Sequence, residues 1–204
     1  MNFDYSKYKY TQKWFNEKTE LKQHLHKYID PKKILCILEI GNFEGLSSSF
    51  FSDNYLDHTN SKLYCVDPFY ISNTISGITS LCINSSTEKL FHNNISKSKY
   101  FNKINTYKLT SDDFFKQNNH LSFDIIYVDG NHEEEYIKND LQNAFKYINI
   151  EGIIWFDDYG GNISVATKLN EKKISTLIDK YLNNYKDRFI IINKGYQLGL
   201  KIIK

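Results

Sequence analysis

Acidic side chains follow two short apolar runs in the second half of the chain. Asp129 ends the run FDIIYVD, and Asp157 and Asp158 directly follow the run IIWF. Carboxylates brought close together repel each other and resist ionisation, and a bound divalent cation removes that cost. A set of oxygen ligands that leaves positions for water and substrate suits Mg²⁺ better than Zn²⁺. These three residues therefore predict a magnesium-type site.

A histidine accompanies this acidic set. His132 lies three residues after Asp129, in the turn before an acidic helical stretch. An imidazole titrates near neutral pH, so it could accept a proton from a hydroxyl held at the metal. A surface residue at a helix start is the structural alternative for His132, and turn chemistry is the alternative for the paired aspartates. Their coincidence favours a site, with His132 as its general base.

A glycine turn follows the first apolar run and reads EIGNFEGLS from Glu39 to Ser47. Gly41 and Gly45 are four residues apart. The middle glycine of a dinucleotide fingerprint and the G-K-[ST] of a P-loop are both missing, so a cofactor without a phosphate fits better. Glu39 could bind an amino group and Ser47 a carboxylate, although an ordinary turn that uses glycine for positive φ stays open. Asp67 ends the next run, where an acid binds ribose hydroxyls in nucleoside-binding folds.

The elements that must position these residues alternate along the chain. Short apolar runs predict buried parallel strands, and longer amphipathic stretches predict helices between them, so we expect a doubly wound α/β sheet. In such a sheet, ligands bind at the carboxyl ends of the strands, where the glycine turn and the carboxylates would meet. The predicted strands are 34–40, 62–67, 103–109, 123–129 and 153–156, the helices are 10–29, 133–148 and 164–185, and a β-hairpin joins 189–192 to 196–203 across Asn193-Lys194-Gly195.

Composition excludes several classes of protein. The 26 basic and 24 acidic residues offer no broad basic field for nucleic acid. No apolar run approaches the roughly 20 residues that span a bilayer, and the N-terminus has no secretory signal, so we expect a cytoplasmic protein without a membrane partner. Cys36, Cys65 and Cys82 form neither a disulfide framework nor a zinc motif. Arg188 is the only arginine beside many lysines, and this bias indicates a virus or microbe with an AT-rich genome.

Four ordered motifs carry a family resemblance: LEIGNFEGLS, YCVDPF, FDIIYVDGNH and GIIWFDDY. Together they resemble the class I S-adenosylmethionine-dependent methyltransferases, and more narrowly the metal-dependent O-methyltransferases of catechol and of macrolide and aminocoumarin sugars. The resemblance implies a Rossmann-like, mostly parallel seven-stranded sheet that ends in an antiparallel hairpin. It also implies a methyltransferase domain over residues 34–204, with residues 1–33 as an N-terminal helical extension that could support a homodimer.

The resemblance assigns a role to each motif. Asn131 departs from the pattern, because some sugar methyltransferases place a proposed catalytic Asp there, and this leaves His132 as the expected base. By position, the cofactor S-adenosylmethionine would be bound by Glu39, Gly41, Gly45, Ser47, Asp67, Ser111 (beside the adenine) and Asp129, and Mg²⁺ or another divalent cation by Asp129, Asp157 and Asp158.

The expected substrate is a hydroxyl group of a small molecule, most simply a sugar or glycan. The connection Pro68–Asn102 is long and rich in hydroxyl and aromatic side chains, and it could cap the site. A single arginine disfavours a highly anionic substrate. Two other readings stay open: a catalytically silent relative that binds the cofactor, and a hydroxylase-like metal enzyme on the same scaffold.

Overall fold

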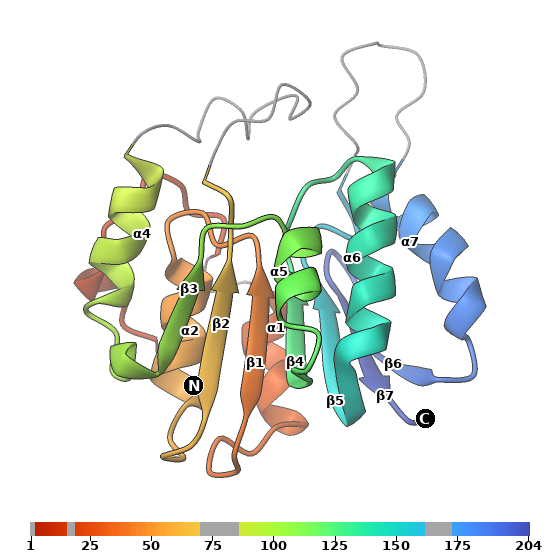
Figure 1. The fold of residues 1–204 in the computed structure, drawn as a ribbon, viewed down its shortest axis with the longest axis horizontal. Helices are drawn as coiled ribbons and strands as arrows, with labels where there is room; N and C mark the ends of the chain where they lie inside the picture. Colours follow the sequence, from red (N-terminus) through yellow and green to blue (C-terminus); the bar gives the residue numbers. More distant parts are fainter. Residues whose placement is uncertain (1–2, 16–18, 70–85, 162–172) are drawn as a thin grey trace.

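The computed structural model describes residues 3–15, 19–69, 86–161 and 173–204. Its centre is one seven-stranded sheet in the order β3-β2-β1-β4-β5-β7-β6 (Figure 1). The first five of these strands are parallel, and β7 pairs antiparallel with both β5 and β6. This confirms the predicted fold class. The strands are β1 Cys36–Ile40, β2 Lys62–Val66, β3 Ile104–Tyr107, β4 Phe123–Val128, β5 Ile148–Phe156, β6 Phe189–Lys194 and β7 Leu198–Ile202.

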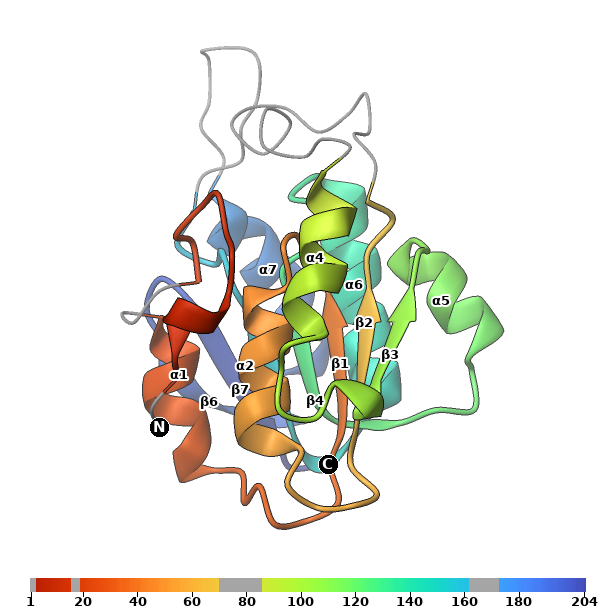
Figure 2. The ribbon, with the colours of Figure 1, turned by 90° about the vertical axis from the view of Figure 1, so that its left-hand side faces the viewer.

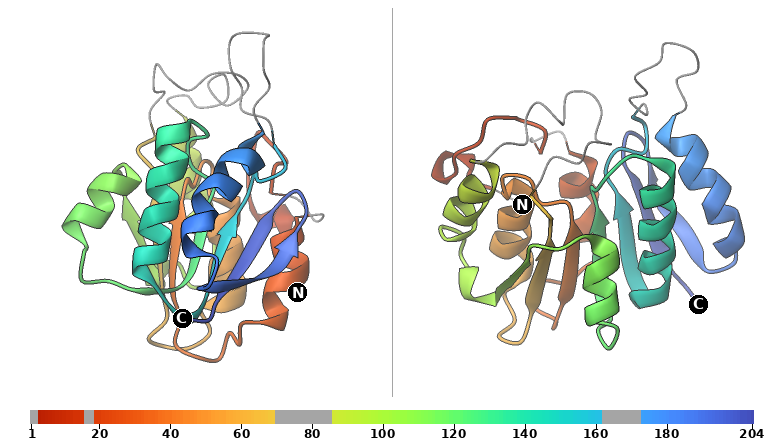
Figure 3. Two further views of the ribbon diagram at one scale, coloured as in Figure 1. Left: turned by 90° about the vertical axis from the view of Figure 1, so that its right-hand side faces the viewer. Right: turned by 45° about the horizontal axis from the view of Figure 1, so that its top comes forward.

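Helices cover both faces of the sheet, as Figures 1 and 3 show. One layer holds α5, α6 and α7, and the other holds α1, α2 and α4. Successive strand residues point to opposite faces, so the strands supply alternate side chains to the two cores. The helices are α1 Glu20–His24, α2 Leu46–Tyr55, α4 Thr87–Ile95, α5 Ser111–Gln117, α6 Glu134–Tyr147 and α7 Ile174–Leu182.

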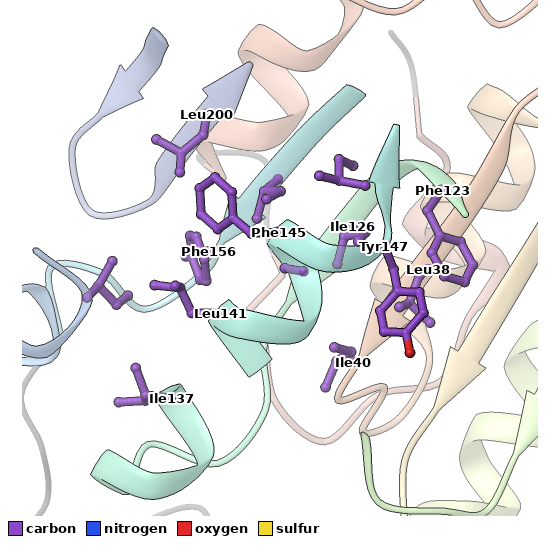
Figure 4. Packing of buried hydrophobic residues seen from close by; sticks show 14 of the residues in the cluster. Leu38, Ile40, Phe123, Ile126, Ile137, Leu141, Phe145, Tyr147, Phe156 and Leu200 are labelled. Carbon is purple, nitrogen blue, oxygen red and sulfur yellow. The ribbon is translucent and has the colours of Figure 1, made fainter. Parts of the chain in front are cut away.

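The core beneath α6 shows how the pattern of that helix dictates its position (Figure 4). Ile137, Leu141 and Phe145 share one face of α6 and pack on Ile126 and Phe156 of the sheet. Their spacing places them on a single stripe of a helix, as the sequence predicted. The described part of the predicted helix 164–185 forms α7 and a 3₁₀ turn over Asn183–Tyr185, and residues 162–172 lie outside the described part of the chain.

The predicted N-terminal helix is wrong over much of its length. Among its described residues, which exclude 16–18, only α1 and a 3₁₀ turn over Leu25–Lys27 are helical, and residues 8–15 run without regular structure along α2 and α4 (Figure 2). Tertiary contacts override the helical spacing here: the Trp14 ring lies 4.8 Å from the ring of Phe43 in the glycine turn. The buried residues of this segment belong to the same core as α2, so residues 3–15 are packed against the domain.

The C-terminal hairpin is present, but its turn lies later than predicted. Asn193 and Lys194 are still paired in β6, and the turn runs through residues 195–197. Glu20 at the start of α1 accounts for this position, because its carboxylate accepts hydrogen bonds from the main chain of Tyr196 (3.2 Å) and Gln197 (2.9 Å). Within the described residues, no helix is long and apolar enough to span a bilayer.

Candidate functional site

The carboxyl ends of four parallel strands form one edge, and the main chain continues across it. Just beyond the strand ends, the N–H of Gly41 donates to Val66 (2.9 Å) and that of Asp129 donates to Ile40 (2.8 Å). Asp157 N–H donates in the same way to Val128 (3.0 Å). These bonds hold the glycine turn and the predicted acidic residues in a row, as expected for a ligand site in an open α/β sheet.

Gly41 and Gly45 adopt left-handed conformations, with φ of 82° and 79°. A Cβ on Gly41 would lie 1.9 Å from the carbonyl oxygen of Asp129. A Cβ on Gly45 would lie 2.8 Å from the ring of Phe91. The turn therefore needs glycine for close approach as well as for φ, and Gly41 is what lets the first turn touch the Asp129 strand end.

Asp67 closes the glycine turn from the second strand. Its Oδ2 accepts the main-chain N–H groups of Asn42 (2.7 Å) and Phe43 (3.0 Å), and its Oδ1 accepts that of Phe69 (2.7 Å). Burial raises the pKa of Asp67, and these bonds oppose the rise. Asp67 therefore shapes the turn in this structure, and its predicted role toward ribose stays a prediction.

Glu39 lies beneath the turn with no exposed surface. Its carboxylate accepts hydrogen bonds from the hydroxyls of Ser47 and Ser48. Burial raises its pKa to about 7, against the effect of these hydroxyls and of the neighbouring Asn42 amide. The two side chains predicted to bind the amino and carboxylate groups of a cofactor are thus paired with each other, and only Ser47 reaches the adjoining pocket.

A pocket, here called the turn pocket, opens between the glycine turn and the acidic edge. Its wall includes Asn42, which is only 2% exposed and whose side-chain nitrogen and oxygen have no hydrogen-bond partner among the described residues. Leaving a buried amide unpaired costs about 1–3 kcal/mol, so it points to a missing polar ligand. The lining residues are Gln12, Trp14, Phe15, Asn42, Phe43, Glu44, Leu46, Ser47, Tyr127, Asp129 and Asp157.

The sequence analysis missed two parts of this pocket. Asn42 stands inside the quoted motif, directly after Gly41, and a polar residue at that place was the available signal. Gln12, Trp14 and Phe15 come from the N-terminal segment that was expected to be helical. No local pattern places them there, because their position depends on contacts with the turn.

The acidic cluster differs in composition from the predicted one. One ligand atom each from Asp129, His132 and Asp158 can be chosen so that all lie within 4.8 Å of one another. The Nε2 of His132 is 3.1 Å from Oδ2 of Asp158, and the hydroxyl of Tyr196 donates to the other oxygen of Asp158 (2.7 Å). Burial opposes ionisation of Asp158, but these two partners bring its pKa below the usual value.

Asp157 stands apart from that group. Its Oδ1 accepts hydrogen bonds from the hydroxyl of Tyr127 (2.6 Å) and from the side-chain amide of Gln197. Burial and the charge of Asp158 raise the pKa of Asp157 to about 6. Asp129 is shifted further, because burial is joined by repulsion from Asp157 and other carboxylates, and its pKa lies well above the usual value. A cation at this edge would relieve that repulsion.

The remaining predicted residues lie on the other side of the edge. Ser111 begins α5, and its hydroxyl donates to the buried carboxyl of Asp140 on α6. Asn131 uses its side-chain oxygen to accept the main-chain N–H of Glu133 (3.0 Å), so it serves the turn before α6. A second pocket lies beside this turn, here called the outer pocket; it is lined by Val128, Gly130, Asn131, His132, Ile137, Asp140, Phe156, Asp157, Asp158, Ile174 and Ile178.

Known proteins resemble this chain in sequence and in fold. An uncharacterized protein of Acanthamoeba polyphaga mimivirus is 33% identical over 132 residues, which cover 63% of this chain and 53% of that protein, so the match spans about half of its length. An O-methyltransferase from Bacillus cereus solved with S-adenosylhomocysteine has a TM-score of 0.59 at 13% identity and covers 83% of this chain and 74% of its own.

The O-methyltransferase NovP has a TM-score of 0.64 at 13% identity, with 91% of this chain and 78% of its own covered. These two structures share the fold. Residues 38–159 match the family described as "Methyltransferase domain", and this range contains the glycine turn, Asp67, His132 and all three predicted metal ligands. The chain therefore belongs to the methyltransferase-domain family, and its sheet has the class I, S-adenosylmethionine-dependent architecture.

Proposed function

We propose that the protein is an S-adenosylmethionine-dependent O-methyltransferase that acts on a hydroxyl of a sugar or glycan with the help of a divalent cation. The observation that carries the proposal is the buried, unpaired amide of Asn42 in the wall of the turn pocket. An amide both donates and accepts hydrogen bonds, which suits the amino and carboxylate groups of a methionine moiety.

The acidic edge supports a transfer between two pockets. Asp129 lines the turn pocket, and Asp158 lines the outer pocket. A cofactor in the turn pocket and an acceptor hydroxyl across the edge would therefore meet near these carboxylates. The sulfonium is already a good leaving group, so the protein's main task in an in-line displacement is to position donor and acceptor.

The residues at the edge fit a divalent cation by their chemistry. Asp129 and Asp158 would hold it, with Asp157 able to approach through Oδ2 because Oδ1 is engaged by Tyr127 and Gln197. A cation there would bind substrate oxygens and lower the pKa of the attacked hydroxyl. Burial, and after it repulsion between the carboxylates, raises the pKa values of Asp129 and Asp157, and a bound cation would favour their ionised forms.

A neutral, hydroxyl-rich substrate suits the surroundings better than an anionic one. Arg188, the only arginine, is engaged elsewhere, because its guanidinium donates to the main-chain oxygens of Phe145 (3.1 Å) and Lys204 (3.2 Å). Most of the expected cap, residues 70–85, lies outside the described part of the chain.

Calorimetric titration with S-adenosylmethionine tests the proposal. We expect binding in the micromolar range, both with Mg²⁺ present and after chelation, because the turn pocket is built from protein groups alone. Methyl transfer to sugar acceptors, followed with labelled cofactor, should occur with a divalent cation and stop on chelation. Absence of cofactor binding in both conditions would contradict the proposed methyltransferase activity. Turnover that persists after chelation would contradict the proposed role of the cation.

A further inference from the structure

His132 and Asp158 are spaced as two ligands of one metal ion. Their facing atoms, Nε2 and Oδ2, are 3.1 Å apart. Two ligand atoms about 2.1 Å from a metal and at right angles to each other are about 3 Å apart. Asp129 offers a third ligand atom within 4.8 Å of both. The three atoms are thus close enough together for a small movement of Asp129 to bring all of them to one ion.

We propose that His132 is a metal ligand, and that Asp129, His132 and Asp158 form a centre that prefers a divalent first-row transition metal, such as Mn²⁺ or Co²⁺, to Mg²⁺. This inference rests on the proposed function, because it specifies the cation of that same site. Mg²⁺ is bound almost entirely through oxygen. An imidazole nitrogen beside two carboxylates adds a ligand that transition metals accept readily and Mg²⁺ does not.

Neighbouring side chains hold this set in place. Tyr196 donates to Oδ1 of Asp158, which leaves Oδ2 directed to the position shared with His132. Hydrogen bonds of this kind orient ligating carboxylates in metal sites. Asp157 is oriented in the same way through Oδ1, by Tyr127 and Gln197, but it is not part of the compact group. The structure therefore favours His132 over Asp157 as the third metal ligand beside Asp129 and Asp158.

Ligation changes the part His132 can play. The Nε2 atom has one lone pair, so it can bind a metal or accept a proton from the substrate, but not both at once. In the structure this atom faces Asp158, with which it can share either a proton or a metal ion. A metal ion held by both groups would take the place of any such proton. His132 is then a ligand, and the proton acceptor for the attacked hydroxyl must be another group.

Electron paramagnetic resonance of Mn²⁺ tests the ligand set without any turnover. The full-length protein is titrated with Mn²⁺, and pulsed spectra are examined for coupling to a directly bound ¹⁴N nucleus. We expect this coupling in the wild type and its loss in His132→Gln. Because a ligand is removed, Mn²⁺ affinity should also fall by about tenfold or more. The affinity for Mg²⁺, measured by competition, should change by less than about threefold, because Mg²⁺ depends on the carboxylates.

His120→Gln is the matched control. His120 is exposed and precedes β4, whose carboxyl end, not its start, carries the site. This variant should keep both the coupling and the Mn²⁺ affinity of the wild type. Bound Mn²⁺ without nitrogen coupling in the wild type would overturn the inference, and so would an absence of Mn²⁺ binding. Calorimetry with S-adenosylmethionine on the same metal-free samples reports separately on the proposed function, since neither variant changes the turn pocket.

Discussion

At the scale of single residues, Asn42 has surroundings that conflict most with its chemistry. Its amide is buried and lies near the carboxylate of Glu39, whose pKa it lowers, but neither polar atom makes a hydrogen bond of normal geometry among the described residues. The nearby main chain is already committed, since the N–H of Asn42 itself donates to Asp67. A polar ligand in the turn pocket resolves the conflict, which makes Asn42 a better marker of the cofactor position than Glu39, whose carboxylate is already satisfied by serine hydroxyls.

Replacing Asn42 by leucine should change the affinity for the cofactor and the stability of the fold in opposite directions. We expect Asn42→Leu to lower the affinity for S-adenosylmethionine by at least about tenfold, or 1.4 kcal/mol. The free energy of unfolding should hold or rise by up to about 1–3 kcal/mol, because the desolvation cost of the unpaired amide disappears. Calorimetry measures the affinity, and urea unfolding measures the free energy of unfolding. Both are done at about pH 5, where Glu39 is protonated, so that the effect of the Asn42 amide on the Glu39 pKa does not enter the comparison. A variant with full cofactor affinity would remove Asn42 from the binding site.

At the scale of elements, the N-terminal segment acts as a wall of the turn pocket. The carboxylate of Glu44 accepts both the main-chain N–H and the hydroxyl of Thr11, each at 2.6 Å. Asn94 on α4 accepts the N–H of Lys9 (2.9 Å) and donates to the main-chain oxygens of Lys9 and Glu44. These contacts fasten residues 9–11 to the glycine turn and to α4, which lie beside this segment in Figure 2.

Removing the carboxylate of Glu44 should release this segment. In Glu44→Ala we expect faster hydrogen exchange at the amides of Lys9 and Thr11 and a weaker affinity for S-adenosylmethionine, because Gln12, Trp14 and Phe15 lose their position in the pocket wall. Exchange measured by mass spectrometry or NMR reports the release. Asp57→Ala is the control, since Asp57 pairs with Lys99 at the surface just beyond the end of α2 and should leave both readouts unchanged. Unaltered exchange in Glu44→Ala would show that Glu44 does not hold the N-terminal segment in place.

At the scale of the whole molecule, the fold buries carboxyl groups at pKa values far from their usual range. Burial raises the pKa of Asp140 to about 7, although the hydroxyl of Ser111 opposes the rise. A carboxyl group with a raised pKa keeps its proton in the folded protein after the unfolded chain has lost it. Its contribution to stability is complete below the usual pKa of 3.8 and is lost as the pH rises through about 7.

Stability should therefore fall between about pH 5 and pH 7 in the presence of a chelator. Each such group contributes a slope of up to about 1.4 kcal/mol per pH unit in this window. Asp140→Asn keeps an oxygen that accepts the Ser111 hydrogen bond but removes the titration, so its free energy of unfolding should decline less over this range. Urea unfolding at several pH values measures the slopes. Equal slopes for wild type and variant would show that Asp140 does not carry this dependence.

The sequence by itself determined the sheet and the edge where the site lies. Apolar runs and amphipathic stripes record which side chains are buried, and residues directly after parallel strands must share one edge. That reasoning placed Gly41, Asp129 and Asp157 correctly in one row. The alternative that the first turn uses glycine for positive φ holds at both Gly41 and Gly45.

Only the tertiary structure decided which groups meet at that edge. Tyr196 and Gln197 reach Asp158 and Asp157 from the hairpin, about 40 residues further along the chain. Part of the N-terminal segment lines the turn pocket in a non-helical conformation, although its sequence pattern predicted a helix. His132 lies against Asp158 and close to Asp129. Periodicity reports burial along one segment, whereas hydrogen bonds and ligand sets depend on distances between segments, and those distances exist only once the chain has packed.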